Sequence, residues 1–320
     1  MENLVSSRCK VESLSEKYIF PPEIRPGKVD VALCESIPVI DLDEKAGHDR
    51  ATIAQEILKA SQDVVKEVFQ MPAEDQASIY SEDPNRSCRL FTGSFHYAKE
   101  DVHCWRDFLK HPCHPDLDQN IQQWPEKPAR YRQVVGTYST EVKKLASKIL
   151  ELICDGLGLE SGYFEGELSE TSALVVNQYP PCPDPSLTLG VRKHCDPNLI
   201  TILLQGDVCG LQVFKDGEWI GVGPVPHAFV INIGSQLQII SNNKLKSAEH
   251  RAVTNSRDAR TSTAFFVGAR RDSAIEPAKA LINAENPPVY RAFEFTEFLS
   301  NYLSNTGDTE VVLEAFKLQE

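Results

Sequence analysis

Long apolar runs and basic clusters are both missing from this sequence of 320 residues. No stretch approaches the roughly eighteen consecutive apolar residues of a transmembrane helix, so no membrane partner is expected. The formal net charge of −13 comes without a basic cluster, which argues against nucleic acid or acidic lipid as a partner. The first residues, Met1–Val5, have neither a charged n-region nor an apolar h-region, so no secretory signal is predicted.

Paired cysteine motifs are missing as well. The 9 cysteines are odd in number and scattered, without a Cys-x-x-Cys. This pattern favours free thiols in a reducing compartment over a disulfide framework or a zinc site, so we expect a cytoplasmic protein. The chain also lacks long repeats and low-complexity segments, and it is long enough to bury a large core in one domain or two.

The sequence pattern of the N-terminal half predicts several helices and one strand. We expect a strand at 36–42, a helix at about 50–70, a short helix from Pro72 and irregular chain at 82–100. His111, Cys113 and His114 have a metal-like spacing, but Pro112 and Pro115 interleave them and favour a loop. A long amphipathic helix is predicted at about 128–157, with an apolar stripe formed by Tyr131, Val134, Val135, Tyr138, Val142, Leu145, Ile149 and Leu152.

From 171 to 270, short apolar stretches are separated by Pro, Gly, Asn and Asp, which is typical of a β-sandwich or jelly roll. A closing helix is expected at 293–304. Within this region His194 and Asp196 stand two residues apart, and His250 follows later. Two imidazoles and one carboxylate on one face of a metal form the facial triad of non-haem Fe(II) oxygenases, which leaves positions open for a cosubstrate and O2. Apolar stretches flank both histidines and predict strands, on which a rigid site can be built.

Arg260 and Ser262 follow the second histidine at a spacing of two residues. Residues i and i+2 of a strand point to the same face, so both side chains are expected to grip one small carboxylate beside the metal. Upstream, Asn177 and Tyr179 share a face of another strand, which the prolines at 180 and 181 end.

Together these motifs resemble the plant 2-oxoglutarate/Fe(II)-dependent dioxygenases, in the branch of hyoscyamine 6-hydroxylase and flavonol synthase. The resemblance covers nearly the whole chain, and it includes the stretches Ile37–Leu42, Trp124–Pro128, Asn177–Pro183, Gly210–Val213, Trp219–Ile220 and Val230–Gly234. It implies an α+β fold with a double-stranded β-helix (jelly roll) core flanked by helices, including a long central helix. The implied parts are an N-terminal region (1–125), a central helix region (126–170), the metal- and cosubstrate-binding core (171–270) and a helical closing segment (271–320), in one structural unit.

The resemblance also implies roles for individual residues. His194, Asp196 and His250 would bind Fe(II), and Arg260 with Ser262 would hold the distal carboxylate of 2-oxoglutarate, a geometry that a guanidinium suits. Tyr179 and Asn177 would lie at the other end of the cosubstrate. O2 would be the second cosubstrate, with ascorbate in support.

The substrate side of the site is less defined. Phe266 would stack on the substrate, although core packing is an equal interpretation for this residue. Phe95 and His96 are assigned to the substrate only by the analogy of their position. The expected substrate is a small specialised metabolite, such as an alkaloid, phenolic or terpenoid, that a monomeric enzyme hydroxylates, dealkylates or desaturates.

One departure from the family pattern keeps other functions open. The strand of the type Gly-Phe-Phe-x-Val-x-Asn-His-Gly and much of the helix after it are absent, about twenty to thirty residues in all. Helical spacing of Ile53, Ile57, Ala60, Val64 and Val68 predicts one continuous helix across the junction. A catalytically impaired paralogue or splice-type variant that acts as a binding protein is therefore the alternative. A zinc or manganese protein without 2-oxoglutarate also fits the three ligands, but it leaves Arg260 and Ser262 unexplained.

Overall fold

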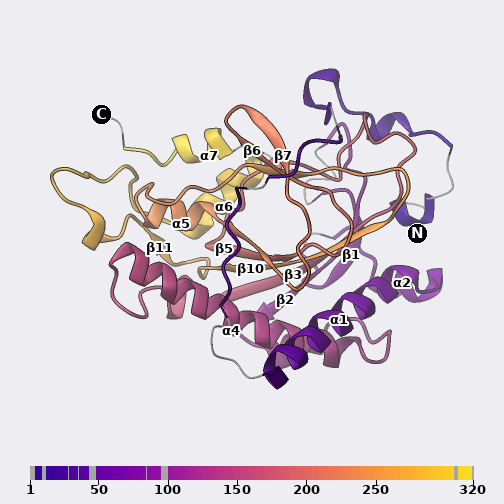
Figure 1. The fold of residues 1–320 in the computed structure, drawn as a ribbon, viewed down its shortest axis with the longest axis horizontal. Helices are drawn as coiled ribbons and strands as arrows, with labels where there is room; N and C mark the ends of the chain where they lie inside the picture. Colours follow the sequence, from indigo (N-terminus) through magenta and orange to yellow (C-terminus); the bar gives the residue numbers. More distant parts are fainter. Residues whose placement is uncertain are drawn as a thin grey trace.

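Two antiparallel sheets face each other, and helices cover the outer side of the larger sheet (Figure 1). The computed structural model describes residues 4–8, 12–27, 29–34, 36–42, 48–83, 85–94, 100–305 and 309–318. The larger sheet has the strand order β1 (Arg89–Thr92), β2 (Asp107–His114), β3 (Thr171–Tyr179), β10 (Arg260–Gly268), β5 (Ile200–Leu204), β8 (Val230–Ile233). The smaller sheet has the order β4 (Val191–His194), β9 (His250–Ala252), β6 (Leu211–Lys215), β7 (Glu218–Gly221). The predicted jelly roll is confirmed.

The helices pack mainly outside this pair of sheets. They are α1 (His48–Gln70), α2 (Ala73–Ile79), α3 (Leu117–Ile121), α4 (Tyr131–Leu157), α5 (Ser235–Ile240), α6 (Phe295–Ser304) and α7 (Thr309–Glu314). A short pair, β11 (Ala274–Ile275) with β12 (Phe293–Glu294), precedes α6. Short 3-10 helices lie at Val5–Arg8, Glu16–Tyr18, Pro22–Ile24, Gly166–Leu168 and Lys279–Leu281. Within the described ranges, no helix is both long and apolar enough to cross a membrane.

The continuous helix across the junction and the long central helix are both confirmed. The valines of α1 (Val64, Val65 and Val68) are buried in the main core, where they join the apolar side of α4. In α4 the expected stripe is buried at Tyr131, Val135, Tyr138 and Val142, but Leu152 is 48% exposed. Its neighbours Leu150 and Cys154 are buried instead, because the buried face has turned away from Leu152 by this point.

Alanine substitution of two glycines at the C-terminal end of α4 is expected to change the free energy of unfolding in opposite directions. Gly158 caps the helix in the left-handed region with φ of 70°, whereas Gly156 lies inside the helix, and a Cβ on either would meet nothing within 4 Å. Gly158→Ala is therefore expected to lower the free energy of unfolding by about 1 kcal/mol, and Gly156→Ala to raise it by about 0.5–1 kcal/mol. Urea unfolding of both variants measures this; equal signs would contradict the conformational argument.

The predicted strand at 36–42 is wrong. In the structure this segment has no ladder, and Val39 and Ile40 are 72% and 74% exposed. Residues 29–34 and 36–42 cross the face shown in Figure 1 from β7, where Leu33 bridges Gly221, to α4, where Lys148 Nζ donates to the Leu42 carbonyl at 2.9 Å. The physical reason is the missing neighbour: a strand forms only against a partner, and the shortened chain supplies none to this segment in the described residues.

Two other expectations need correction. The stretch 82–100 is not irregular throughout, because it contains β1. His111, Cys113 and His114 lie in β2, not in a loop, because a register shift between Pro112 and His114 accommodates the proline in the ladder. His111 is buried with its Nε2 3.3 Å from the Tyr131 hydroxyl, and burial lowers the pKa of His111 to about 3. The three residues therefore serve packing.

Candidate metal and cosubstrate site

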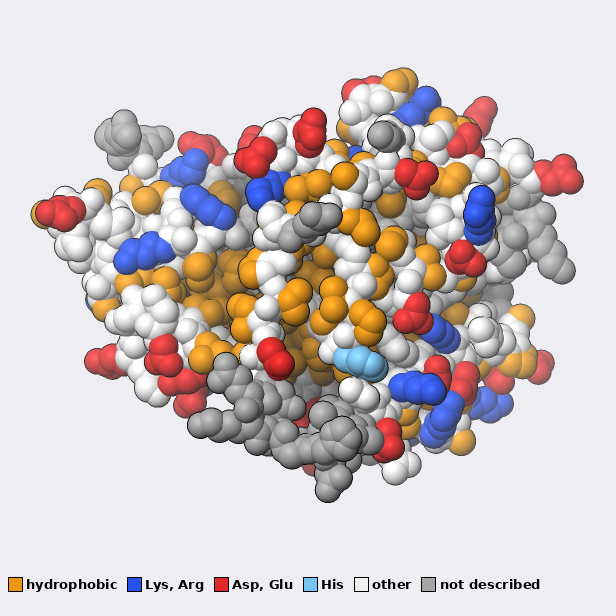
Figure 2. Space-filling view, in the orientation of Figure 1, with side chains coloured by type: hydrophobic (Ala, Val, Ile, Leu, Met, Phe, Trp, Pro, Cys, Tyr) orange, Lys and Arg blue, Asp and Glu red, His pale blue; other side chains and the backbone are white. Residues whose placement is uncertain are grey.

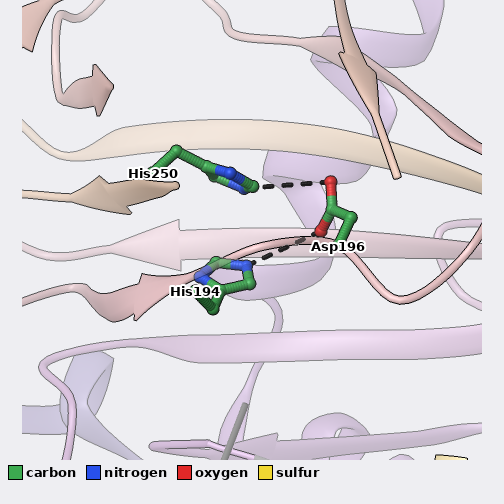
Figure 3. Close-up of side chains that lie close together, drawn as sticks. All are labelled: His194, Asp196 and His250. Carbon is green, nitrogen blue, oxygen red and sulfur yellow. Dashed lines mark ion pairs between the residues drawn. The ribbon is translucent and has the colours of Figure 1, made fainter. Parts of the chain in front are cut away.

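Three side chains from the smaller sheet meet at one point. His194 ends β4, His250 begins β9, and the two are Cα partners in the ladder. Asp196 follows the end of β4 and turns its carboxylate between them: its Oδ1 lies 3.6 Å from His194 Nε2 and its Oδ2 lies 3.8 Å from His250 Nε2. Figure 3 shows both imidazoles directed at this carboxylate. One ligand atom from each residue can be chosen so that all three lie within 4.8 Å of one another.

The outer nitrogen of each imidazole is fixed by the backbone. His194 Nδ1 lies 2.9 Å from the Arg192 carbonyl and His250 Nδ1 lies 3.0 Å from the Ala248 carbonyl. Because a carbonyl only accepts, both rings carry the proton on Nδ1 and present a lone pair on Nε2. This is the arrangement that metal-binding histidines use to set their tautomer and orientation.

Asp196 is held as an anion in a buried place. It is 2% exposed, and the Asn232 amide donates to its Oδ2 at 3.4 Å. Burial alone would raise the pKa of Asp196, but His250, His194 and the Thr201 hydroxyl together lower it well below its ordinary value. A buried carboxylate beside two imidazoles that each present Nε2 is a donor set for a divalent cation. The residues present therefore fit Fe(II).

Arg260 and Ser262 lie together on one face of β10, as predicted. Arg260 is 2% exposed; its Nε donates to the Val208 carbonyl at 3.1 Å and its Nη1 to Ser262 Oγ at 3.5 Å. Burial lowers the pKa of Arg260, which Tyr179 partly offsets. Gly210 makes room for this side chain, because a Cβ there would lie 2.7 Å from Arg260 Cδ.

Asn177 and Tyr179 reach the same place from β3, opposite Ser262 and Arg260 respectively. The Asn177 amide donates to Ser262 Oγ at 3.4 Å, and the Arg260 guanidinium lies 5.1 Å from the Tyr179 ring centroid. The expectation that these two residues would lie at the other end of the cosubstrate is therefore not met: they belong to the arginine end.

Two further residues were not selected from the sequence. Arg106 is buried and its Nη1 donates to Asn177 Oδ1 at 3.1 Å, so the amide group of Asn177 is turned toward Ser262. Tyr302 of α6 donates to the Cys195 carbonyl at 3.0 Å, between the first two ligands in the chain. The residue type of Arg106 alone gives no signal of this contact in the sequence.

The substrate side is placed in part. Phe266 is half-buried and lies on the same face of β10 as Arg260 and Ser262. Phe95 and His96 lie outside the described residues. On the face seen in Figure 2, hydrophobic side chains gather in a hollow in the middle, while charged side chains lie mainly toward its margin.

Comparisons with known proteins agree with this geometry. Residues 170–269 match the family model of the 2OG-Fe(II) oxygenase superfamily. The chain is 40% identical to hyoscyamine 6-dioxygenase of Hyoscyamus niger, over 98% of each chain. It is also 40% identical to flavanone 3-dioxygenase 2 of Oryza sativa subsp. japonica, over 96% of this chain and 95% of that protein. A crystal structure of JOX2 in complex with 2OG, Fe and JA superposes with a TM-score of 0.85 at 31% identity, over 99% of this chain and 98% of that one.

The alignment with hyoscyamine 6-dioxygenase also contains gaps in this chain. It runs over 344 positions but covers 98% of the 320 residues here, about 314, so about 30 positions are gaps in this chain. This agrees with the predicted loss of twenty to thirty residues. The metal ligands, the buried arginine and the near full-length identity lead to one conclusion: the chain belongs to the 2OG-Fe(II) oxygenase superfamily.

Proposed function

We propose that this protein is a plant dioxygenase that uses Fe(II), 2-oxoglutarate and O2 to hydroxylate a small specialised metabolite, with dealkylation or desaturation as variants of the same reaction. Iron, when bound, supplies the activation of O2 and the oxidative decarboxylation of 2-oxoglutarate to succinate and CO2. The relatives support the substrate class, since they include dioxygenases named for hyoscyamine, flavanone and 2'-deoxymugineic acid.

One observation carries the proposal: a charged, buried arginine stands in the same site as an unbroken set of three metal ligands. His194, Asp196 and His250 would hold the iron through Nε2, Oδ and Nε2. Arg260 would bind the distal carboxylate of 2-oxoglutarate, with Ser262 donating a hydrogen bond and Asn177 and Tyr179 fixing the two. Burial excludes water from this end, which strengthens the pairing of the two charges.

The alternative, a binding protein without catalysis, is not favoured. What supports catalysis is that His194, Asp196 and His250 lie together as one His-Asp-His cluster. A metal protein without 2-oxoglutarate would leave the buried Arg260 guanidinium with no carboxylate to bind, at a cost in folding free energy.

We further propose a monomer that acts on a free small molecule in the cytoplasm and binds neither nucleic acid nor membrane. The net charge of −13 argues against binding to nucleic acid. The eight described cysteines, which are all free thiols, support a reducing compartment.

Anaerobic titration with Fe(II) and 2-oxoglutarate tests the proposal. A weak metal-to-ligand charge-transfer band in the visible is expected only when both are present, because 2-oxoglutarate must chelate the metal. Succinate release in the presence of O2, ascorbate and a metabolite panel is the second readout. Folded protein that gives no band would overturn the proposal.

A further inference from the structure

The carboxylate ligand does not stand in a strand. Asp196 lies in the connection 195–199, which leaves β4 of the smaller sheet and enters β5 of the larger sheet. Figure 3 shows its side chain on this curved connection, beside the strand end that carries His194. A ligand in a loop keeps its place only where other segments hold the backbone, and a metal site tolerates displacements of only about 0.5 Å. The contacts of 195–199 therefore decide how well the three ligands meet.

The segment 232–236, which we call the β8–α5 turn, runs along this connection and donates backbone hydrogen bonds to it. The bonds join Ser235 N to the Asp196 carbonyl at 2.8 Å, Gly234 N to the Leu199 carbonyl at 2.8 Å and Gln236 N to the Asn198 carbonyl at 3.2 Å. The first of them engages the carbonyl of the metal ligand itself. The β8–α5 turn therefore sets the backbone position of Asp196.

The same turn holds the Asp196 side chain. Asn232 is half-buried and is the Cα partner of Thr201 across β8 and β5, so the two side chains leave the sheet on one face. The Asn232 amide donates to Asp196 Oδ2 at 3.4 Å, and the Thr201 hydroxyl also hydrogen-bonds this carboxylate. An amide and a hydroxyl are uncharged donors, so they orient the carboxylate and leave its charge for a cation.

The turn and the connection come closest at Gly234. A Cβ at this position would overlap the Asn198 carbonyl oxygen and would lie 2.6 Å from the Asn198 carbonyl carbon. Gly234 has an extended backbone with φ of −92°, so the need for glycine is steric and not conformational. The atoms that a Cβ would meet belong to the backbone, which cannot rotate away as the end of a side chain can. A larger residue must therefore push the turn and the connection apart.

The other side of the connection is held by β10, because β5 lies between β8 and β10 in the sheet. Leu199 N donates to the Val267 carbonyl at 3.0 Å, and the buried Asn198 amide donates to the same carbonyl at 3.2 Å. The connection is thus fixed on two sides and has little room to yield toward β10. A push at Asn198 is transmitted along the chain to Asp196, two residues away.

We propose that Asn232 and Gly234 are positioning residues of the metal centre, which fix the Asp196 carboxylate and thereby set the affinity for Fe(II). This deepens the proposed function and rests on its metal site. Partners that orient a metal ligand are worth about 10- to 100-fold in metal affinity. Arg260 begins β10, whereas Val267 lies near its other end, so binding of 2-oxoglutarate at the arginine should not depend on the β8–α5 turn.

Asn232→Ala and Gly234→Ala test this in the full chain. The matched controls are Asn120→Ala, which removes an amide that donates to the Cys113 carbonyl at 3.0 Å, and Gly158→Ala at the end of α4. The Fe(II) dissociation constant is measured anaerobically, without 2-oxoglutarate, by competition with a chromogenic chelator. The charge-transfer band at saturating Fe(II) then gives the 2-oxoglutarate concentration for half-saturation. Circular dichroism gives the melting temperature of each metal-free protein.

Asn232→Ala and Gly234→Ala should each weaken Fe(II) binding roughly tenfold or more and leave the half-saturation by 2-oxoglutarate unchanged. Gly158→Ala should keep the parent affinity for Fe(II) although it lowers the melting temperature, so lost stability alone does not produce the effect. Asn120→Ala should keep it as well. Parent affinity for Fe(II) in either test variant overturns the inference for that residue, and an equal loss in the controls overturns it for both. If Gly234→Ala does not fold, Asn232→Ala decides.

The failure of this inference is distinguishable from the failure of the proposed function. The inference is measured by the affinity for Fe(II) alone, whereas the proposed function is measured by the charge-transfer band with 2-oxoglutarate and by succinate release. A parent protein that binds Fe(II) without giving the band overturns the proposed function only. A parent protein that binds no Fe(II) overturns both.

Discussion

Replacement of Asp196 by alanine will remove Fe(II) binding and turnover together. The carboxylate is the only anionic member of the described ligand set, and it lies between two imidazoles with Nε2 atoms at 3.6 and 3.8 Å. Loss of a partner that merely orients a ligand already costs about 10- to 100-fold in metal affinity, so loss of the ligand itself should exceed roughly 100-fold. Iron content after anaerobic loading and gel filtration, together with the charge-transfer band, measures the effect.

Asp155→Ala is the matched control, because Asp155 is an exposed aspartate on α4. It should load iron as the parent protein does. Circular dichroism and the melting temperature establish that Asp196→Ala is folded. An Asp196→Ala protein with full iron occupancy and full turnover would show that the three residues are not the metal site.

Arg260→Ala should leave iron binding in place and raise the requirement for 2-oxoglutarate. Its guanidinium is buried, and truncation of one partner in a buried charge pair costs about 2–5 kcal/mol, which corresponds to at least roughly 30-fold in the concentration for half-saturation. The charge-transfer band should therefore appear only at higher 2-oxoglutarate. Ser262→Ala should shift it less, because it removes one neutral hydrogen bond worth about 1 kcal/mol.

Arg257→Ala provides the comparison for this variant, since Arg257 is an exposed arginine in the turn before β10. Its 2-oxoglutarate dependence should match that of the parent protein. If Arg260→Ala kept the parent dependence as well, the distal carboxylate would have to be bound elsewhere, and Arg106 would be the next guanidinium to replace.

The metal ligands could be predicted from the sequence because their spacing reflects local geometry. His194 and Asp196 are close in the chain, and the alternation of β10 places Arg260 and Ser262 on one face. The jelly roll and α4 were predictable for the same reason, since periodic burial leaves a periodic sequence. The role of Arg106 was not predictable, because its contact with Asn177 joins residues far apart in the chain.

The sequence-based predictions were wrong where the local sequence favours one structure and contacts with distant segments impose another. Ile37–Leu42 has the composition of a strand, but a strand needs a neighbour, and this segment has no ladder partner among the described residues. Pro112 suggested a loop, yet a register shift lets β2 continue past it. The position of Tyr179 beside Arg260 depends on the register between β3 and β10, which no single strand encodes.

Gly210 contributes to this site through the side chain that it lacks. The arginine lies where it does because position 210 has no side chain, and any Cβ there would collide with Arg260 Cδ at 2.7 Å. A library that randomises only residues with functional groups would therefore never sample a position that sets where the Arg260 side chain can lie. Unbiased mutagenesis would find it, as a site where even alanine is too large.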